Sequence, residues 1–247
     1  MTVSKIISGV WRAGTRYVNW YLIDAGEGGV TVIDAGLPQY QRHLDESLHQ
    51  IGRRRDDARA VLLTHGHIDH TGMAAALAGN GARIYLHPAD RRLAADPRSN
   101  RAERSLLRYA YYPGLMAFAG HAIRAGALRP LPMPDTAPVA DGSVVEVPGQ
   151  PRVTHTPGHT DGSCVFDFAG HGVVFVGDLL CTVGPFSGRR AGPQLQLRAS
   201  NKSSAQAMAS LGRLAEIHSR IVLPGHGSPW KDGVHAAITS ARRIGCR

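Results

Sequence analysis

Four side chains that commonly bind metal ions fall within six consecutive residues of this 247-residue chain. They are His65, His67, Asp69 and His70. Side chains alternate in an extended segment, so His65 and His67 point to the same side and can reach one ion. Asp69 and His70 follow where the chain begins to coil and project elsewhere, which suits a second ion close to the first. The spacing therefore predicts two neighbouring cations.

A simpler interpretation takes these residues one at a time, with Asp69 as a helix cap and the histidines as ordinary loop residues. It suits any single member but does not account for four potential ligands together. The flanking sequence places them between two elements. Residues 60–63 form an apolar run typical of a buried strand, and residues 73–78 are typical of a helix. The group is therefore expected at a strand-to-helix turn.

Three further candidate ligands lie downstream, each directly after a glycine and close to the end of an apolar run. They are His159, Asp178 and His226. Asp34 ends an earlier apolar run at residues 31–33. Loops at strand ends commonly present ligands in enzymes built on sheets. We therefore expect these side chains to complete the predicted metal site.

This ordered set resembles the metallo-β-lactamase-fold hydrolases, a superfamily that includes glyoxalase II and the lactonases. Its marks are an Asp after an early strand, His-x-His-x-Asp-His, a Gly-His, a Gly-Asp and a final Gly-His. All five occur here in that order, over about residues 18–226. The resemblance implies an α/β fold, a four-layer αβ/βα sandwich of two mixed β-sheets flanked by helices, with the metals at one edge.

The resemblance also implies a role for each candidate residue. One metal ion would be bound by His65, His67 and His159, and the other by Asp69, His70 and His226. Asp178 would bridge the two ions. Asp34 would lie beneath the metal loop and orient it through hydrogen bonds. Two divalent ions are expected, and nitrogen- and oxygen-rich ligation suits zinc, with iron or manganese as alternatives.

The expected activity is hydrolysis of a lactone, ester or thioester by a hydroxide held between the two cations, which attacks the carbonyl. Asp69 would orient the hydroxide and pass a proton to the leaving group. The metal-dependent phosphodiesterases and nucleases of the superfamily share these ligands and remain an alternative, as does a non-catalytic metal-binding scaffold. A β-lactamase is disfavoured because one subclass has Cys where Asp178 stands. Glyoxalase II itself is disfavoured because only 21 residues follow His226.

The remaining patterns predict a single domain over residues 1–247. A hairpin is expected at residues 18–34, followed by a surface helix at 39–51. Later strands are expected at 144–147, 152–156, 163–168 and 173–178, and later helices at 204–218 and 233–244.

Between about residues 88 and 138 the pattern changes to Arg- and Ala-rich helical segments, including 102–112 and 115–123. This insertion is predicted to form a cap over the metals, with Tyr111, Met116 and Phe118 contacting an apolar acyl substrate. The alternative is that its apolar side chains pack on the sandwich or on a second subunit. In that second case the protein would be a homodimer.

The composition excludes several other classes. The net charge is +9, but the basic clusters are short, and Arg53–Arg55 is followed at once by two aspartates, so nucleic-acid binding is not expected. No apolar stretch has the length of a signal peptide or a membrane span, and a cytoplasmic protein without membrane contact is expected. The three cysteines, Cys164, Cys181 and Cys246, lack metal-type spacing and are expected to be reduced.

Overall fold

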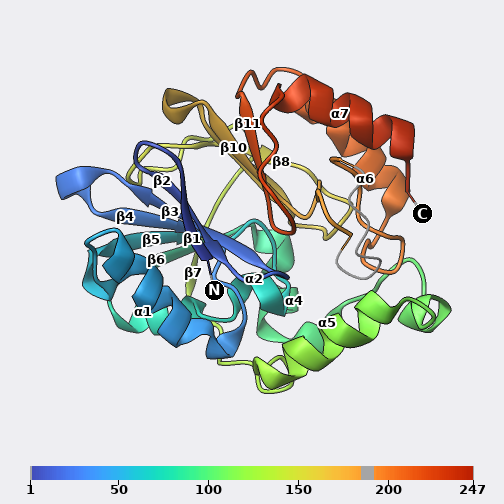
Figure 1. Cartoon of the computed structure of the whole chain (residues 1–247), viewed down its shortest axis with the longest axis horizontal. Coiled ribbons are helices and arrows are strands. Elements are labelled where there is room, and N and C mark those ends of the chain that lie inside the picture. Colours follow the sequence, from blue (N-terminus) through green and yellow to red (C-terminus); the bar gives the residue numbers. More distant parts are fainter. Residues whose placement is uncertain (1, 185–191, 247) are drawn as a thin grey trace.

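The computed structural model describes residues 2–184 and 192–246, which form two β-sheets covered by helices (Figure 1). The strands of the first sheet are, in spatial order, β1 (Thr2–Ile7), β2 (Val10–Gly14), β3 (Asn19–Asp24), β4 (Val30–Ile33), β5 (Ala58–Leu62), β6 (Arg83–Leu86) and β7 (Thr136–Pro138). Neighbours from β1 to β4 are antiparallel, and those from β4 to β7 are parallel.

The second sheet has the order β11 (Ile221–Pro224), β10 (Val173–Gly177), β9 (Cys164–Phe168) and β8 (Arg152–His155). The β8, β9 and β10 strands pair antiparallel, whereas β10 and β11 are parallel. Both sheets are therefore mixed, and the predicted fold class is confirmed.

The α-helices are α1 (Gln41–Gln50), α2 (Ile68–Thr71), α3 (Ala74–Gly79), α4 (Arg91–Ala95), α5 (Pro113–Arg124), α6 (Ser204–Ser210) and α7 (Gly233–Ile244). Shorter 3₁₀ helices are η1 (Gly26–Gly28), η2 (Pro38–Tyr40), η3 (Arg55–Asp57), η4 (Pro88–Asp90), η5 (Pro97–Ser99), η6 (Leu106–Tyr109), η7 (Ala169–His171) and η8 (Leu211–Leu214). No helix within the described ranges is both long and apolar enough to cross a bilayer.

Three apolar clusters hold the layers together. Between the sheets, Tyr21 and Ile23 of β3 pack with Phe166 and Phe175 of the second sheet. Leucines of α1 and α3 cover the outer face of the first sheet, and α6 and α7 cover the outer face of the second. Because each sheet is buried on both faces, its strands read as continuous apolar runs rather than alternating ones. This arrangement gives the four layers of the sandwich.

The two sheets are also joined by hydrogen bonds where β11 ends. The buried Asn19 side chain donates to the carbonyls of Pro224 and Gly227, both at 2.8 Å, and the Tyr21 hydroxyl donates to Pro224 at 2.6 Å. These bonds tie β3 of one sheet to the loop that carries His226. At the edge where the candidate ligands lie, the two sheets are therefore held to each other by hydrogen bonds.

Two predicted elements are largely wrong. Residues 102–112 were expected to be helical, but only η6 forms there, and Tyr109 is the one buried side chain of that stretch. A short helix without an apolar face to bury is not stable in water. Residues 144–147 form an isolated bridge from Val144 to Arg152 instead of a strand, since Val145 bonds back to the Pro151 carbonyl in a local turn.

Other boundaries also differ from the prediction. The helix expected at 204–218 ends at Ser210 and continues as η8. The N-terminal hairpin of β1 and β2 was not predicted. The end of the expected insertion, Thr136–Pro138, is the edge strand β7, which pairs with β6. The chain between η4 and β7 carries α4 and α5, and α5 lies at the periphery of the molecule (Figure 1), where Phe118 and Ala122 pack on the apolar cluster of the first sheet.

Candidate metal centre

The loop after β5 presents the first four candidate ligands. His65 lies in the turn, His67 is the extended residue before α2, and Asp69 and His70 occupy the first turn of that helix. The predicted strand-to-helix turn is thus observed. His65 and His70 are almost completely buried, whereas Asp69 and His67 are partly exposed. The least buried ligands face the side from which a substrate would enter.

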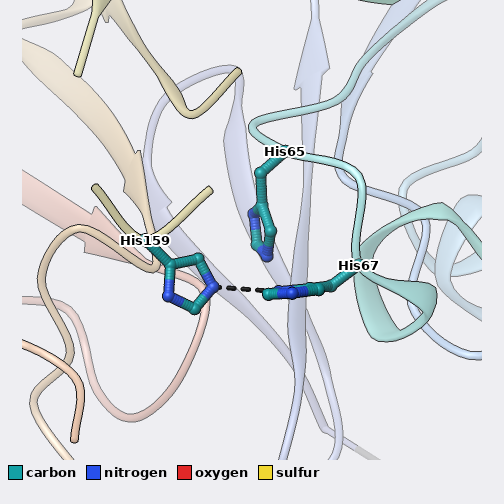
Figure 2. A group of neighbouring side chains, drawn as sticks. All are labelled: His65, His67 and His159. Carbon is teal, nitrogen blue, oxygen red and sulfur yellow. Dashed lines mark hydrogen bonds between the residues drawn. The ribbon is translucent and has the colours of Figure 1, made fainter. Parts of the chain in front are cut away.

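The structure brings all seven candidate ligands into one cluster. Ligand atoms lie within 4.8 Å of one another in three groups: His65, His67 and His159; Asp69, His70 and His226; and His65, His70 and Asp178. Figure 2 shows the first group, in which three imidazoles from two distant loops converge. The third group joins the other two. The first two groups contain the same residues as the two expected ligand sets, and the third contains the expected bridge, Asp178, with one histidine from each set.

Asp178 occupies the position between the two histidine groups. Its Oδ2 lies 3.5 Å from His159 Nε2 and 3.1 Å from His226 Nε2, and its Oδ1 lies 3.5 Å from His70 Nε2. Burial raises the pKa of Asp178, but the imidazoles of His226, His70 and His159 outweigh burial and hold it well below its ordinary value. The carboxylate is therefore ionised and reaches both groups.

Several ligand atoms lack any hydrogen-bond partner among the described residues although they are buried. They are His65 Nε2, His67 Nε2, His70 Nε2 and Asp178 Oδ1. A buried polar atom without a partner costs about 1–3 kcal/mol, so four in one cluster would be a large penalty. A cation in contact with these lone pairs removes it. The donor set of imidazoles and carboxylates thus fits divalent metal ions.

Each of four imidazoles is oriented through its other nitrogen. His65 Nδ1 lies 3.0 Å from Thr64 Oγ1, and His159 Nδ1 lies 3.1 Å from Asn201 Oδ1. His226 Nδ1 contacts the carbonyl oxygen of Tyr17. Such contacts fix the ring and direct its Nε2 into the cluster. Burial, together with the neighbouring His67, lowers the pKa of His159 to about 3.

Asp34 holds the fourth imidazole and the metal loop together. Its Oδ2 lies 2.8 Å from His70 Nδ1, and its Oδ1 accepts the Thr64 N–H at 2.8 Å. Burial lowers the pKa of His70, but Asp34, Asp69 and Asp178 more than offset burial and bring it to about 10. The side chain of Asp34 thus lies beneath the loop, where the resemblance implied it.

Asp90 is a structural residue of the site that sequence reasoning missed. This buried carboxylate accepts hydrogen bonds from the Gly66 N–H at 2.8 Å, the Thr160 hydroxyl at 2.6 Å and the Gly162 N–H at 2.7 Å. It therefore ties the loop of His65 and His67 to the loop that follows His159. Its sequence context, Pro88–Asp90, indicates only the start of a helix.

Glycine is required before all three downstream ligands. A Cβ at Gly158, before His159, would lie 2.1 Å from the backbone nitrogen of Ala207. A Cβ at Gly225 would lie 2.4 Å from Asp178 Oδ1, and a Cβ at Gly177 would lie 2.5 Å from Thr64 Oγ1. Gly177 also has a φ of +49°, which favours glycine. The Gly-Asp and Gly-His pairs of the sequence thus reflect the closeness of two loops at the metal cluster.

A cavity of about 190 Å³ opens onto the cluster. Its wall combines candidate ligands and the polar Asn100, Gln196 and Ser200 with five apolar side chains: Ile68, Pro97, Leu106, Phe118 and Ala199. Phe118 also lies edge-on to His226, with ring centroids 6.2 Å apart. Met116 lines a different cavity, and Tyr111 is 72% exposed and lines neither. Of the three predicted substrate residues, Phe118 alone lies at the metal cluster.

Comparison with known proteins agrees with this geometry. Residues 13–226 match the family model of the metallo-beta-lactamase superfamily. An uncharacterized protein of Mycobacterium tuberculosis is 30% identical over 224 residues, which cover 88% of this chain and 83% of the relative.

Solved structures also resemble this chain. A metallo-beta-lactamase family protein from Thermus thermophilus superposes with a TM-score of 0.68 at 26% identity, over 97% of this chain and 79% of that one. A protein crystallised in a di-iron-bound form superposes with a TM-score of 0.58 at 27% identity, over 91% and 95% of the two chains.

A sandwich of two mixed sheets with a histidine and aspartate cluster at one edge defines the class of metal-dependent hydrolases. The chain belongs to the metallo-beta-lactamase superfamily.

Proposed function

We propose that the protein is a dinuclear metal-dependent hydrolase that cleaves a lactone, ester or thioester. The observation that carries this proposal is the set of seven clustered candidate ligands, four of whose buried atoms have no hydrogen-bond partner among the described residues. Two divalent cations, most simply zinc, would supply an activated water and a polarised carbonyl oxygen there. Iron is the alternative that the di-iron form of the similar protein supports.

The residues of the chain would divide the remaining work. His65, His67 and His159 hold one cation, and Asp69, His70 and His226 hold the other, with Asp178 between them. Asp69 is the acidic ligand that is partly exposed, and it lines the cavity. It is therefore placed to orient the attacking water and to deliver a proton to the leaving group.

The lining of the cavity favours an acyl substrate over a phosphodiester. Among the described residues that line it, there is no lysine or arginine, although the chain as a whole is strongly basic. Phosphodiesterases usually clamp phosphate oxygens with cationic side chains in addition to metals. The apolar wall instead suits an acyl group.

Replacement of Asp178 by Ala tests the metal assignment. We expect the variant to lose at least one of two bound ions and nearly all hydrolytic activity, because the bridging carboxylate is gone. Elemental analysis and turnover of lactones, aryl esters and thioesters measure both effects. Asp232→Ala, at an exposed aspartate far along the chain, is the control and should keep two ions and full activity.

Three results would contradict the assignment. A folded wild-type protein that holds fewer than two ions after metal loading would exclude the dinuclear site. Two bound ions without turnover of any substrate would indicate a binding scaffold. Cleavage of phosphodiesters or β-lactams, with no acyl ester hydrolysed, would indicate another branch of the superfamily.

We also propose that the chain between η4 and β7 caps the metals and selects the acyl group. Leu106 and Phe118 of this segment line the cavity. Phe118→Ala should enlarge it and shift the preferred acyl length upward by one or more carbons, with metal content unchanged. The rates for a series of aryl esters of increasing chain length measure the shift. Met116→Ala, outside the cavity, is the matched control, and equal profiles for the two variants would contradict the cap.

A further inference from the structure

Exposed apolar side chains are concentrated in one part of the chain, residues 97–131, which we call the 97–131 segment. Of eight large hydrophobic residues exposed among those described, seven belong to it: Leu106, Leu107, Tyr111, Met116, Ile123, Leu128 and Leu131. Leu107 is 84% exposed and Leu128 is 69% exposed. Scattered exposed hydrophobics are common on proteins, but concentration of this kind marks an interaction surface.

Helix α5 shows the same feature within one element. None of its twelve residues is fully buried. Its exposed positions recur at helical spacing and are mostly apolar: Pro113, Met116, Ala117, Gly120, Ile123 and Arg124. The opposite side packs inward, with Phe118 and Ala122 against the core of the first sheet. The outward face of α5 is therefore apolar like its inward face, whereas an ordinary surface helix has a polar outward face.

The 97–131 segment is also strongly cationic. It contains six arginines, all exposed, and a single acidic residue, Glu103. More than half of the net charge of +9 thus lies in this part of the chain. The carboxylate of Glu103 is already engaged by the Ser204 N–H at 2.8 Å. The exposed arginines are therefore available to bind negatively charged groups of a partner.

A cavity of about 660 Å³ continues this surface beside α5. Met116, Gly120 and Arg124 form part of its wall, and Arg16 and Tyr40 belong to the part contributed by other elements. Among the described residues, no carboxylate lines it. Guanidinium groups next to an apolar helix face are the combination that binds phosphate head groups above acyl chains.

We propose that the 97–131 segment docks the protein onto the surface of a bilayer that contains anionic phospholipids. The apolar side chains of α5 and η6 enter the boundary between head groups and acyl chains, and the arginines bind lipid phosphates. A second copy of the chain fits less well, because a two-fold interface would place the same arginines opposite one another. The proposal concerns binding alone and does not depend on the reaction catalysed.

Flotation of the metal-loaded protein with lipid vesicles tests the proposal. We expect binding to phosphatidylcholine vesicles that contain about 30% phosphatidylglycerol, weak binding to phosphatidylcholine alone, and release as salt is raised. No binding to the anionic vesicles would overturn the proposal, as would equal binding to both compositions.

Two sets of substitutions locate the surface. The triple variant Leu107→Ser, Met116→Ser and Ile123→Ser should abolish flotation. The triple variant Arg108→Gln, Arg124→Gln and Arg129→Gln should weaken it about a hundredfold, since each arginine near an anionic membrane contributes about a fivefold gain. All six positions are exposed, so the fold should be unaffected.

Matched controls come from elsewhere on the surface. Val144→Ser removes the one exposed large hydrophobic of the described residues outside the segment. Arg220→Gln, Arg242→Gln and Arg243→Gln remove the same charge from other exposed sites. Both should bind as the wild type does, and a loss equal to that of the segment variants would overturn the assignment of the surface. Sedimentation that reveals a dimer, lost in the serine variant, would show that a second copy covers this surface instead.

Discussion

The carboxylate of Asp90 illustrates how one buried side chain can organise a metal site without touching the metal. It is 1% exposed and accepts three hydrogen bonds from two loops that supply His65, His67 and His159. Hydrogen bonds to a charged acceptor contribute more to stability than neutral ones, about 1.5–3 kcal/mol each. The relative positions of His65, His67 and His159 therefore depend on a residue that is not itself a ligand.

Asp90→Asn should lower the free energy of unfolding by about 2–3 kcal/mol and weaken metal binding about 10- to 100-fold, because an amide cannot accept from all three donors. Urea unfolding and metal titration measure the two effects. Asp161→Asn is the control. Among the described residues, the side chain of this exposed neighbour in the loop after His159 pairs only with Lys202, in a surface ion pair worth less than about 1 kcal/mol. An Asp90→Asn variant with unchanged stability and metal affinity would contradict the role.

At the scale of elements, Glu103 fastens the 97–131 segment to the start of α6. Its backbone N–H donates to the Asn201 carbonyl at 2.7 Å, and its carboxylate accepts the Ser204 N–H at the first turn of the helix. This hydrogen bond holds the pKa of Glu103 below its ordinary value. A negative charge at a helix N-terminus is favourable for the same electrostatic reason.

The lowered pKa gives the attachment a defined pH dependence. The folded protein favours the ionised carboxylate, so the stabilisation is fully present above the ordinary pKa of glutamate and is lost as the pH falls through the lowered value. Glu103→Gln should therefore speed tryptic cleavage at Arg101 and Arg104 near neutral pH. The stability difference from the wild type, under about 1 kcal/mol for this exposed group, should disappear as the pH falls through the lowered pKa of Glu103. A pH-independent difference would contradict the role of the charge.

At the scale of the whole molecule, the metal centre lies on the junction of the two sheets. The loop after β5 in the first sheet supplies His65, His67, Asp69 and His70, and strand-end loops of the second supply the other three ligands. A cation there contacts both halves at once. An ion that binds only the folded state stabilises it by RT ln(1 + L/Kd), where L is the concentration of the free ion and Kd its dissociation constant.

Removal of the metals should therefore destabilise the entire sandwich and not a single loop. The metal-loaded protein should unfold at a midpoint several degrees above that of the chelator-treated protein, with a stabilisation of about 4 kcal/mol when the free ion exceeds its dissociation constant a thousandfold. Calorimetry with and without chelator measures this. The Asp178→Ala variant should respond less, and equal midpoints for loaded and stripped wild-type protein would contradict the coupling.

The sequence by itself indicated the candidate ligands, because four of them are neighbours in one turn and local backbone geometry sets how they project. The other three were recognisable because each follows a glycine, and a Cβ at Gly225 or Gly177 would collide with the site. The apolar runs likewise predicted most strands of the two sheets, since strands buried on both faces need continuous apolar side chains.

Tertiary structure alone decided the partners of those ligands and the surface around them. Asp90 and Asn201 reach loops 24 and 42 residues away through side-chain hydrogen bonds, and no local pattern encodes a bond of that span. Periodicity in the 97–131 segment indicated helices but not which face would be covered, so Phe118 and Met116 could not be told apart. Packing against the first sheet turned Phe118 toward the metal cluster and left Met116 exposed, because burial depends on what other elements bring to the same place.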